Sequence, residues 1–273
     1  MASGVRLAGD GRLFEFQFDG EQGPMLRRRN EPPAIPRDCQ SCPIREATVC
    51  RALADGLDVL QAFKLGDRIL PTHSHLYRPG DKPAELYNLL DGWIALYRIL
   101  EDGTRQVLQV VLPGAFIGYQ PSLEEPMAHG AECITDVSVC VFPRKAFPDL
   151  LEKYPAVAHR VVWLVAHDLM EAQDHLTNVG GRPATERVAH FLLQIYLRMR
   201  QDHPANREDM LELPLTQELI ADALGMTPVY VNRILRQLRE RGLVMLRNRT
   251  LWIMDFEGLR RLAEIPPLDA VEP

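Results

Sequence analysis

Several features are missing from the sequence, and each absence excludes a class of protein. There is no run of the roughly eighteen apolar residues that a membrane-spanning helix needs. The first residues, MASGVRLAGDGRLFEF, lack the apolar centre of a secretory signal. The histidines and acids show no triad spacing, no metalloprotease motif and no P-loop. We therefore expect a cytoplasmic protein with no membrane partner that is not an enzyme.

Cysteine is scarce as well, at five among 273 residues. An odd number in a reducing compartment does not indicate a disulfide framework. Three of the five fall within twelve residues, however, at Cys39, Cys42 and Cys50. Three cysteines so close together therefore indicate a function other than disulfide bonding.

Charge is unevenly distributed along the chain. The net charge is −6, but residues 227–249 carry six arginines against one acid, Glu240. A segment of charge +5 in an acidic protein is typical of a surface that binds phosphate. The run Arg27, Arg28 and Arg29 could also touch phosphate, but we read residues 1–36 as a mobile extension with a solvated charge cluster.

The middle of the chain shows two successive patterns. Over residues 57–148, short apolar segments alternate with turns such as Asp91-Gly92 and Pro113-Gly114, which predicts an antiparallel roll or barrel. Over 156–176, apolar residues recur at intervals of three and four without Gly or Pro, which predicts a long helix within 149–180. Its apolar stripe packs on its own domain or on a second copy. The position between two domains favours a homodimer.

A helix-turn-helix pattern follows at residues 216–242. Thr216 can cap a first helix, and Gly225 can turn the chain. Thr227 and Pro228 then suit the first positions of a second helix that ends at Gly242. Residues 243–246 and 250–254 read as two strands of a wing.

Residue spacing assigns the faces of the second helix. At 100° per residue, Val231, Ile234, Leu235 and Leu238 share one side and must pack inward. The opposite side begins at the N-terminal turn, which a recognition helix inserts into the major groove of double-stranded DNA. Arginine can bind guanine there and asparagine can bind adenine. The candidate DNA-binding residues are Thr227, Val229, Asn232, Arg233, Arg236, Arg247 and Arg249.

Three motifs resemble the CRP/FNR family of bacterial regulators. They are Pro-Gly-Ala-Phe-Ile-Gly at 113–118, Pro-Ala-Thr-Glu-Arg-Val-Ala at 183–189, and Thr-Gln-Glu-Leu-Ile-Ala-Asp-Ala-Leu-Gly at 216–225. The resemblance implies an α+β fold with an N-terminal β-roll of the cyclic-nucleotide-binding kind, a long dimerisation helix and a C-terminal winged helix-turn-helix. It also implies RNA polymerase as a partner. The expected parts are an extension at 1–36, a cysteine loop at 37–56, the roll at 57–148, the dimerisation helix at 149–180, the DNA-binding domain at 181–263 and a tail at 264–273.

The same resemblance bears on specificity and on the ligand of the roll. The family often reads bases with Glu, Ser and Arg, where this sequence has Val229, Asn232 and Arg233, so we predict no target sequence. Nucleotide-binding members hold the phosphate with an Arg-Ser pair and use a Glu soon after the roll signature. The matching positions here are His129-Gly130 and Tyr119, so we expect no cyclic nucleotide.

Three thiols in one short loop suit a soft metal centre. The segment from Cys39 to Cys50 resembles the loop that binds a 4Fe-4S cluster in the FNR branch. Such a cluster takes four ligands, typically all cysteine. The fourth is Cys140 or Cys133, and the position of Cys140 just before the long helix matches the family better. Cys133 would then be a small buried apolar residue.

Other inputs stay open beside the cluster. His73 or His75 could complete a zinc site with the loop cysteines, and the thiols could respond to oxidation without metal. The regulator could also act constitutively, and a ligand-binding module without DNA contact is a further alternative. The resemblance implies that an intact cluster lets the long helices pair. Its loss to oxygen would then weaken pairing and operator binding.

Overall fold

The computed structural model describes residues 4–7, 13–16, 35–36, 38–53, 57–122, 124–202 and 210–266. It forms two units, Met1–Pro32 and Pro33–Pro273. In the first unit, β1 (Gly4–Leu7) pairs antiparallel with β2 (Leu13–Phe16), two strands that the sequence pattern did not indicate. The arginine run at 27–29 and most of the expected tail at 264–273 lie outside the described residues.

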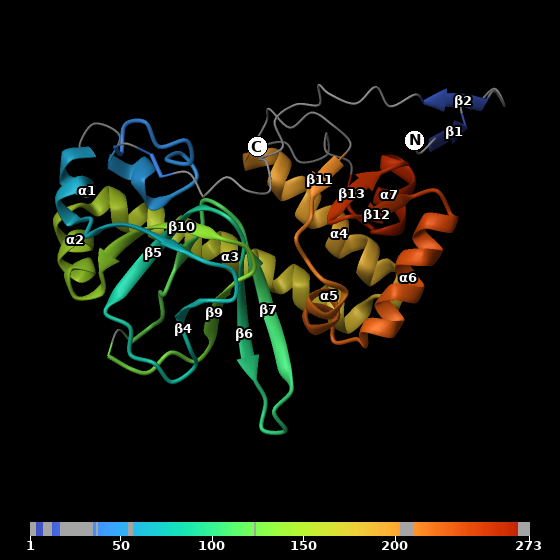
Figure 1. Ribbon diagram of the computed structural model, residues 1–273. Coiled ribbons are helices and arrows are strands. Elements are labelled where there is room, and N and C mark those ends of the chain that lie inside the picture. Colours follow the sequence, from blue (N-terminus) through green and yellow to red (C-terminus); the bar gives the residue numbers. More distant parts are fainter. Residues whose placement is uncertain are drawn as a thin grey trace. The chain divides into compact units, whose positions relative to one another are not determined.

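The predicted β-roll is confirmed as two four-stranded antiparallel sheets (Figure 1). Their strand orders are β3-β10-β5-β8 and β4-β9-β6-β7. The strands are β3 (Gly66–Leu70), β4 (His75–Tyr77), β5 (Glu85–Asp91), β6 (Ile94–Ile99), β7 (Arg105–Val111), β8 (Phe116–Ile117), β9 (Gly130–Cys133) and β10 (Val137–Pro143). Gly92 makes the tight β5–β6 turn at φ +91°, where a Cβ would collide with the carbonyl oxygen of Asp136.

Short helices surround the start and end of the roll. They are η1 (Val49–Leu53), α1 (Leu57–Phe63), η2 (Arg144–Ala146) and α2 (Phe147–Lys153). The sequence places the start of the roll at residue 57, whereas the first strand of the roll begins at Gly66. β3 lies at a sheet edge with no buried residue, so its sequence carries little apolar signal.

The helix predicted over 149–180 is divided into α2 and α3 (Pro155–Gly181). Tyr154 separates them with φ −127° and ψ 84°. Pro155 disfavours helical geometry at the residue before it and has no N–H for the preceding turn. Because α3 begins at Pro155, the helix available for pairing is 27 residues long.

The C-terminal part of the chain is a winged helix-turn-helix. Its helices are α4 (Ala184–Asp202), α5 (Gln217–Leu224), α6 (Pro228–Glu240) and α7 (Phe256–Leu262). Its sheet has the order β11-β13-β12, from β11 (Met210–Glu212), β12 (Val244–Arg247) and β13 (Thr250–Ile253). β11 has only three residues and follows a polar segment, so no sequence pattern indicates it. Among the helices that are described, none has the length and apolarity to cross a bilayer.

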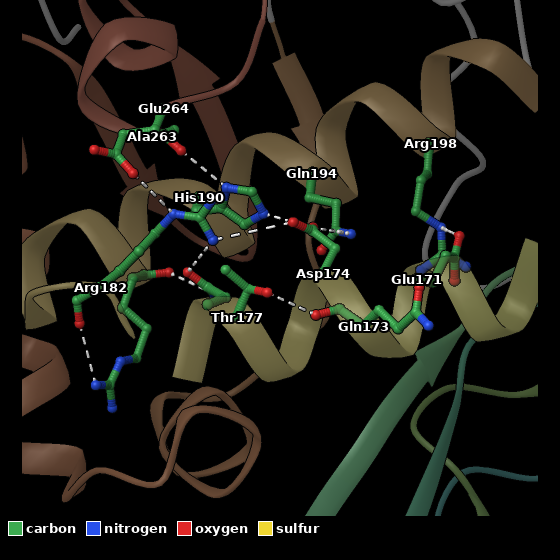
Figure 2. A network of polar contacts seen from close by, with 12 residues as sticks. Glu171, Gln173, Asp174, Thr177, Arg182, His190, Gln194, Arg198, Ala263 and Glu264 are labelled. Atoms are coloured by element: carbon green, nitrogen blue, oxygen red, sulfur yellow. Dashed lines mark hydrogen bonds and ion pairs between the residues drawn. The ribbon is translucent and has the colours of Figure 1, made fainter. Parts of the chain in front are cut away.

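The end of α3 is tied to α4, the first helix of the C-terminal part, by polar contacts (Figure 2). The Asn178 side chain is buried and donates from Nδ2 to the carbonyl oxygen of Arg187, at 3.2 Å. Arg182 connects α3 to α4 and lies 3.5 Å from a carboxylate oxygen of Glu264, beyond α7. These contacts fix the direction in which α4 leaves α3.

Candidate DNA interface and cysteine cluster

The two helices of the helix-turn-helix begin and end as their sequence predicts. Thr216 Oγ1 accepts a hydrogen bond from the Leu219 amide at 3.1 Å, which caps α5. Gly225 ends α5 in the left-handed conformation at φ +62°. Thr227 Oγ1 accepts from the Tyr230 amide at 3.3 Å, and Pro228 occupies the first position of α6. Local chemistry therefore sets the angle at which α6 leaves α5.

The faces of α6 lie as the residue spacing indicates. The apolar residues Val231, Ile234, Leu235 and Leu238 are buried in the core of the domain. Asn232, Arg233 and Arg236 are exposed, and 81% of Val229 is accessible to solvent. All seven candidate DNA-binding residues are exposed, so the surface expected to meet DNA is free to do so in this chain.

Three side chains of this face have intramolecular partners. Asn232 Nδ2, on α6, donates a hydrogen bond to Gln217 Oε1, on α5, at 2.9 Å. The guanidinium of Arg233 lies 4.5 Å from the centre of the Tyr230 ring, within cation–π range. Arg236 forms an ion pair with Glu240 at 2.9 Å, one turn further along α6. Sequence reasoning did not identify Gln217 or Tyr230, because nothing in the sequence measures a distance between two helices.

The wing is a two-residue hairpin between β12 and β13. Asn248 and Arg249 both have positive φ, 51° and 60°, as a tight turn of primed type requires. The Leu213 amide donates to the carbonyl oxygen of Arg249 at 2.7 Å and supports this turn. Arg247 and Arg249 are exposed at the tip, where they can reach a DNA backbone.

Cys140 belongs to a polar row across one sheet of the roll. On β10 it pairs with Asp67 on β3 and with Asn88 on β5. Its Sγ lies 3.3 Å from Asp67 Oδ1. Asn88 Nδ2 donates to the Sγ of Cys50 at 3.6 Å, which places the loop cysteine over the same row.

The other loop cysteines lie in the same region. Cys50 and Cys140 are both buried in one apolar cluster, and Cys39 and Cys42 pack against that cluster. Cys133 is buried in a different cluster, on β9 in the other sheet. The structure thus brings the three loop cysteines together with Cys140 and not with Cys133.

The two histidines considered for a zinc site make other contacts. His73 Nδ1 lies 3.3 Å from Glu132 Oε1, and His75 packs against the Tyr97 ring at 5.9 Å between centroids. Both contacts belong to the sheet that contains Cys133. The described geometry therefore gives no support to a zinc site made from these histidines and the cysteine loop.

Burial dominates the electrostatics of the thiols. It raises the pKa of Cys42, raises that of Cys50 to about 11 and raises that of Cys140 further. The Lys64 ammonium, paired with Asp67 at 2.6 Å, lowers the pKa of all three and opposes that effect.

The donor chemistry fits a soft metal centre, since four thiols are gathered beside one cation. Within the ranges that the structure describes, however, no three His, Cys, Asp or Glu side chains are arranged to hold a metal ion. Common ligation would therefore require the loop to close over Cys140.

Arg160 on α3 holds the cysteine loop. Its Nε donates to the carbonyl oxygen of Thr48 at 3.1 Å, and its Nη2 donates to those of Glu46 and Ala47 at 3.1 and 2.7 Å. The same guanidinium lies 4.0 Å from the centre of the Trp163 ring. One side chain thus touches both the segment before Cys50 and an exposed aromatic residue of α3.

A broad apolar face of α3 is exposed in the single chain. Its first turns are anchored by Val157 and Val161, which are buried in the roll. Along the remainder of the helix, large apolar side chains face solvent. They are Val162, Trp163, Val165, Leu169, Met170 and Leu176. An exposed patch of this kind is typical of an interface.

The phosphate position of the roll has no arginine. His129 Nε2 lies 2.9 Å from the hydroxyl oxygen of Tyr77. Burial lowers the pKa of His129, so this ring is neutral at neutral pH. A Cβ at Gly130 would collide with the Tyr97 ring, which occupies the space of the residue that the resemblance expects here.

A β-roll, a long helix and a winged helix-turn-helix with an exposed basic face define a DNA-binding transcription regulator. Two family models match: the Cyclic nucleotide-binding domain over residues 67–154 and the Crp-like helix-turn-helix domain over 186–262. The Nitrogen fixation regulation protein FixK of Bradyrhizobium diazoefficiens is 31% identical over 226 residues, covering 82% of this chain and 93% of that protein. The Transcriptional activator protein FnrL of Cereibacter sphaeroides is 30% identical over 84% of this chain and 93% of its own length.

Solved structures agree with these relatives. FixK2 from Bradyrhizobium japonicum has a TM-score of 0.66 and 27% identity, and the match covers 74% of this chain and 98% of that one. The chain belongs to the CRP/FNR family of transcription regulators. It is accordingly a DNA-binding regulator of the FNR and FixK type and not an enzyme.

Proposed function

We propose that this regulator is a cytoplasmic homodimer that responds to oxygen or redox state through a 4Fe-4S cluster held by Cys39, Cys42, Cys50 and Cys140. The observation that carries the proposal is that Cys50 contacts Asn88, the residue paired with Cys140 in the sheet. Both cysteines are buried in one apolar cluster, against which Cys39 and Cys42 pack. When bound, the cluster would supply an oxidisable centre next to the dimerisation helix.

The chain's own residues provide the path from the loop to DNA. Arg160 binds the loop through three carbonyl groups, so its position depends on how the loop is folded. Through Trp163 the same side chain contributes to the exposed apolar face of α3. A loop that folds differently would alter this face and weaken pairing of the two α3 helices.

Pairing would set the spacing of the two recognition helices. A dimeric helix-turn-helix protein binds half-sites about one helical turn of DNA apart. We expect RNA polymerase to be the further partner, as the family resemblance implies, and we expect the roll to bind no cyclic nucleotide because neutral His129 stands where a phosphate needs a cation. A titration with duplex DNA should give affinity that falls steeply with salt.

Metal and sulfide analysis after oxygen-free purification tests the sensor. We expect about four irons per chain in the wild type. Cys140→Ala should lose the iron. Cys133→Ala should retain it, because Cys133 is buried in a different apolar cluster from the loop cysteines. If Cys140→Ala keeps the iron and Cys133→Ala loses it, the fourth ligand is Cys133 and not Cys140.

A second candidate is a regulator of the same family without a cluster, which acts constitutively or responds through its thiols. It is favoured by the described geometry, in which no three potential ligands are arranged around a common metal position. Iron-free wild type that binds DNA equally with and without oxygen would support constitutive action. One zinc per chain would indicate the zinc alternative.

A further inference from the structure

Asn232 is the base-reading candidate that takes its partner from another helix. Its Nδ2 donates to Oε1 of Gln217, the first residue of α5, at 2.9 Å. Arg233 and Arg236 instead contact Tyr230 and Glu240 of α6 itself. The hydrogen bond therefore links the two helices of the motif at the surface that faces DNA.

This bond decides which way the Asn232 carboxamide points. Asparagine reads adenine only when its oxygen faces the N6 amino group and its nitrogen faces N7. The terminal torsion of an exposed asparagine is broad, so a free side chain spends much of its time in other orientations. In the structure Gln217 accepts from the nitrogen side of the Asn232 carboxamide. When the NH2 group of Gln217 donates to a phosphate, which only accepts, Gln217 can offer Asn232 only its oxygen and so opposes the flipped state.

The bond leaves the reading groups unoccupied. The Asn232 amide has two N–H groups, and Gln217 uses one of them. The second N–H and the Oδ1 atom remain for the two atoms that adenine presents in the major groove. Gln217 uses only its oxygen, so its own NH2 group can donate to the DNA backbone, which the first helix of the motif crosses.

We propose that Gln217 is a specificity-determining residue that acts through Asn232, by holding its carboxamide in the orientation that reads adenine in each half-site. The proposal rests on the DNA-binding function of the family. It does not depend on the cluster or on any other sensor input. It assigns a positioning role to a side chain at the start of α5, outside the recognition helix.

The test compares base preferences of full-length variants, purified without oxygen, by selection from a randomised duplex library and by titration of the selected duplexes. We expect the wild type to prefer adenine at one position of each half-site. Asn232→Ala should lose that preference, a change of roughly 10- to 100-fold in discrimination. Gln217→Ala should lose part of it, about 3- to 10-fold, at the same position and at no other.

Two further variants separate positioning from a structural or backbone role. Gln217→Glu keeps the accepting oxygen, so it should retain the adenine preference even though its charge weakens binding to all duplexes. Glu218→Ala changes the exposed neighbour of Gln217 and should leave the preference unaltered. In the double variant, Gln217→Ala should add no further loss at this position to that of Asn232→Ala, because the two residues act as one unit.

Two results would overturn the proposal while the regulator function stands. In the first, Gln217→Ala weakens binding to every duplex equally and leaves the base preference unchanged. Gln217 would then contact only the DNA backbone. In the second, Asn232→Ala keeps the adenine preference, so that Asn232 reads no base. Thermal unfolding of each variant shows whether the domain remains folded. A wild type that selects no sequence at all would instead contradict the DNA-binding function.

Discussion

The buried ring of His190 lies between two oxygen atoms. Its Nε2 is 2.7 Å from Oδ2 of Asp174 on α3, and its Nδ1 is 2.9 Å from the carbonyl oxygen of Ala263 (Figure 2). Both partners are hydrogen-bond acceptors, and the same Asp174 oxygen also accepts a hydrogen bond from Gln194 Nε2 at 3.0 Å. The pair joins α3 to the DNA-binding domain.

Replacing Asp174 with Asn should therefore loosen this junction. The variant keeps the size of the side chain but replaces the carboxylate that His190, Gln194 and Arg182 contact with a neutral amide. We expect the free energy of unfolding to fall by about 1–2 kcal/mol, since Asp174 itself is partly exposed. Urea denaturation measures this change. Glu257→Gln, which alters the pair between the exposed Glu257 carboxylate and Arg260, should change stability by less than about 0.5 kcal/mol. An unchanged urea midpoint for Asp174→Asn would show that the contact contributes nothing.

Arg160 gives the second prediction, which concerns pairing. Arg160→Ala removes the donor to three loop carbonyls and the contact with Trp163, so we expect the dimer dissociation constant to rise at least tenfold. An effect of that size corresponds to about 1.4 kcal/mol. Arg160→Lys should recover only part of the loss, because one ammonium does not reproduce the planar fork. Sedimentation velocity of the chain as purified measures the constant.

The control for Arg160 lies on the same helix. His159 is its exposed neighbour, and His159→Ala should leave the dissociation constant unchanged. If Arg160→Ala dimerises as the wild type does, the loop and the α3 face are not coupled through this side chain.

Much of the DNA-binding domain could be predicted from the sequence because its determinants are local. Caps at Thr216 and Thr227, a turn at Gly225 and a period of 3.6 residues decide where α5 and α6 lie and which face of α6 is buried. The bond from Asn232 to Gln217 could not be predicted in this way. It depends on the crossing of the two helices, which no residue spacing encodes.

The cysteines show the same division. The loop of three could be recognised from its spacing, but the choice between Cys140 and Cys133 remained open. That choice depends on sheet register: β10 places Cys140 between Asp67 and Asn88, whereas β9 places Cys133 opposite Ile94 in the other sheet. Register is a long-range property that turn chemistry only partly specifies.

The third prediction uses the pKa of Cys50 in metal-free protein. Because burial raises this pKa to about 11, the thiolate fraction near pH 8 is roughly a hundredfold lower than for an ordinary thiol with a pKa near 9. Alkylation of Cys50 by iodoacetamide should be slow at pH 8. Its rate should rise about tenfold per pH unit and level off near pH 11 rather than near pH 9, because raising the pH populates the reactive anion.

Mass spectrometry of the alkylated peptides measures these rates. The same chain unfolded in urea is the control, and there Cys50 should react at the rate of an ordinary exposed thiol. Equal rates for Cys50 in the folded and unfolded chains would mean that the loop is open, and that burial does not protect this thiol.

The last prediction concerns Val229, which stands where the family often has Glu. Its side chain is 81% exposed at the first turn of α6, the part of a recognition helix that enters the major groove. In the major groove the apolar partner for such a group is the thymine methyl. Replacing thymine with uracil at one operator position should weaken wild-type binding about fourfold, from about 0.8 kcal/mol per buried carbon. Val229→Ala should remove this dependence.

Arg247→Ala is the matched control for Val229, because Arg247 is exposed at the wing tip, outside the recognition helix, where we expect it to contact the DNA backbone. That variant should weaken binding to all sequences and reduce the salt dependence by about one unit of slope, yet keep the preference for thymine over uracil. If the wild type binds uracil and thymine equally at every position, Val229 contacts no methyl group.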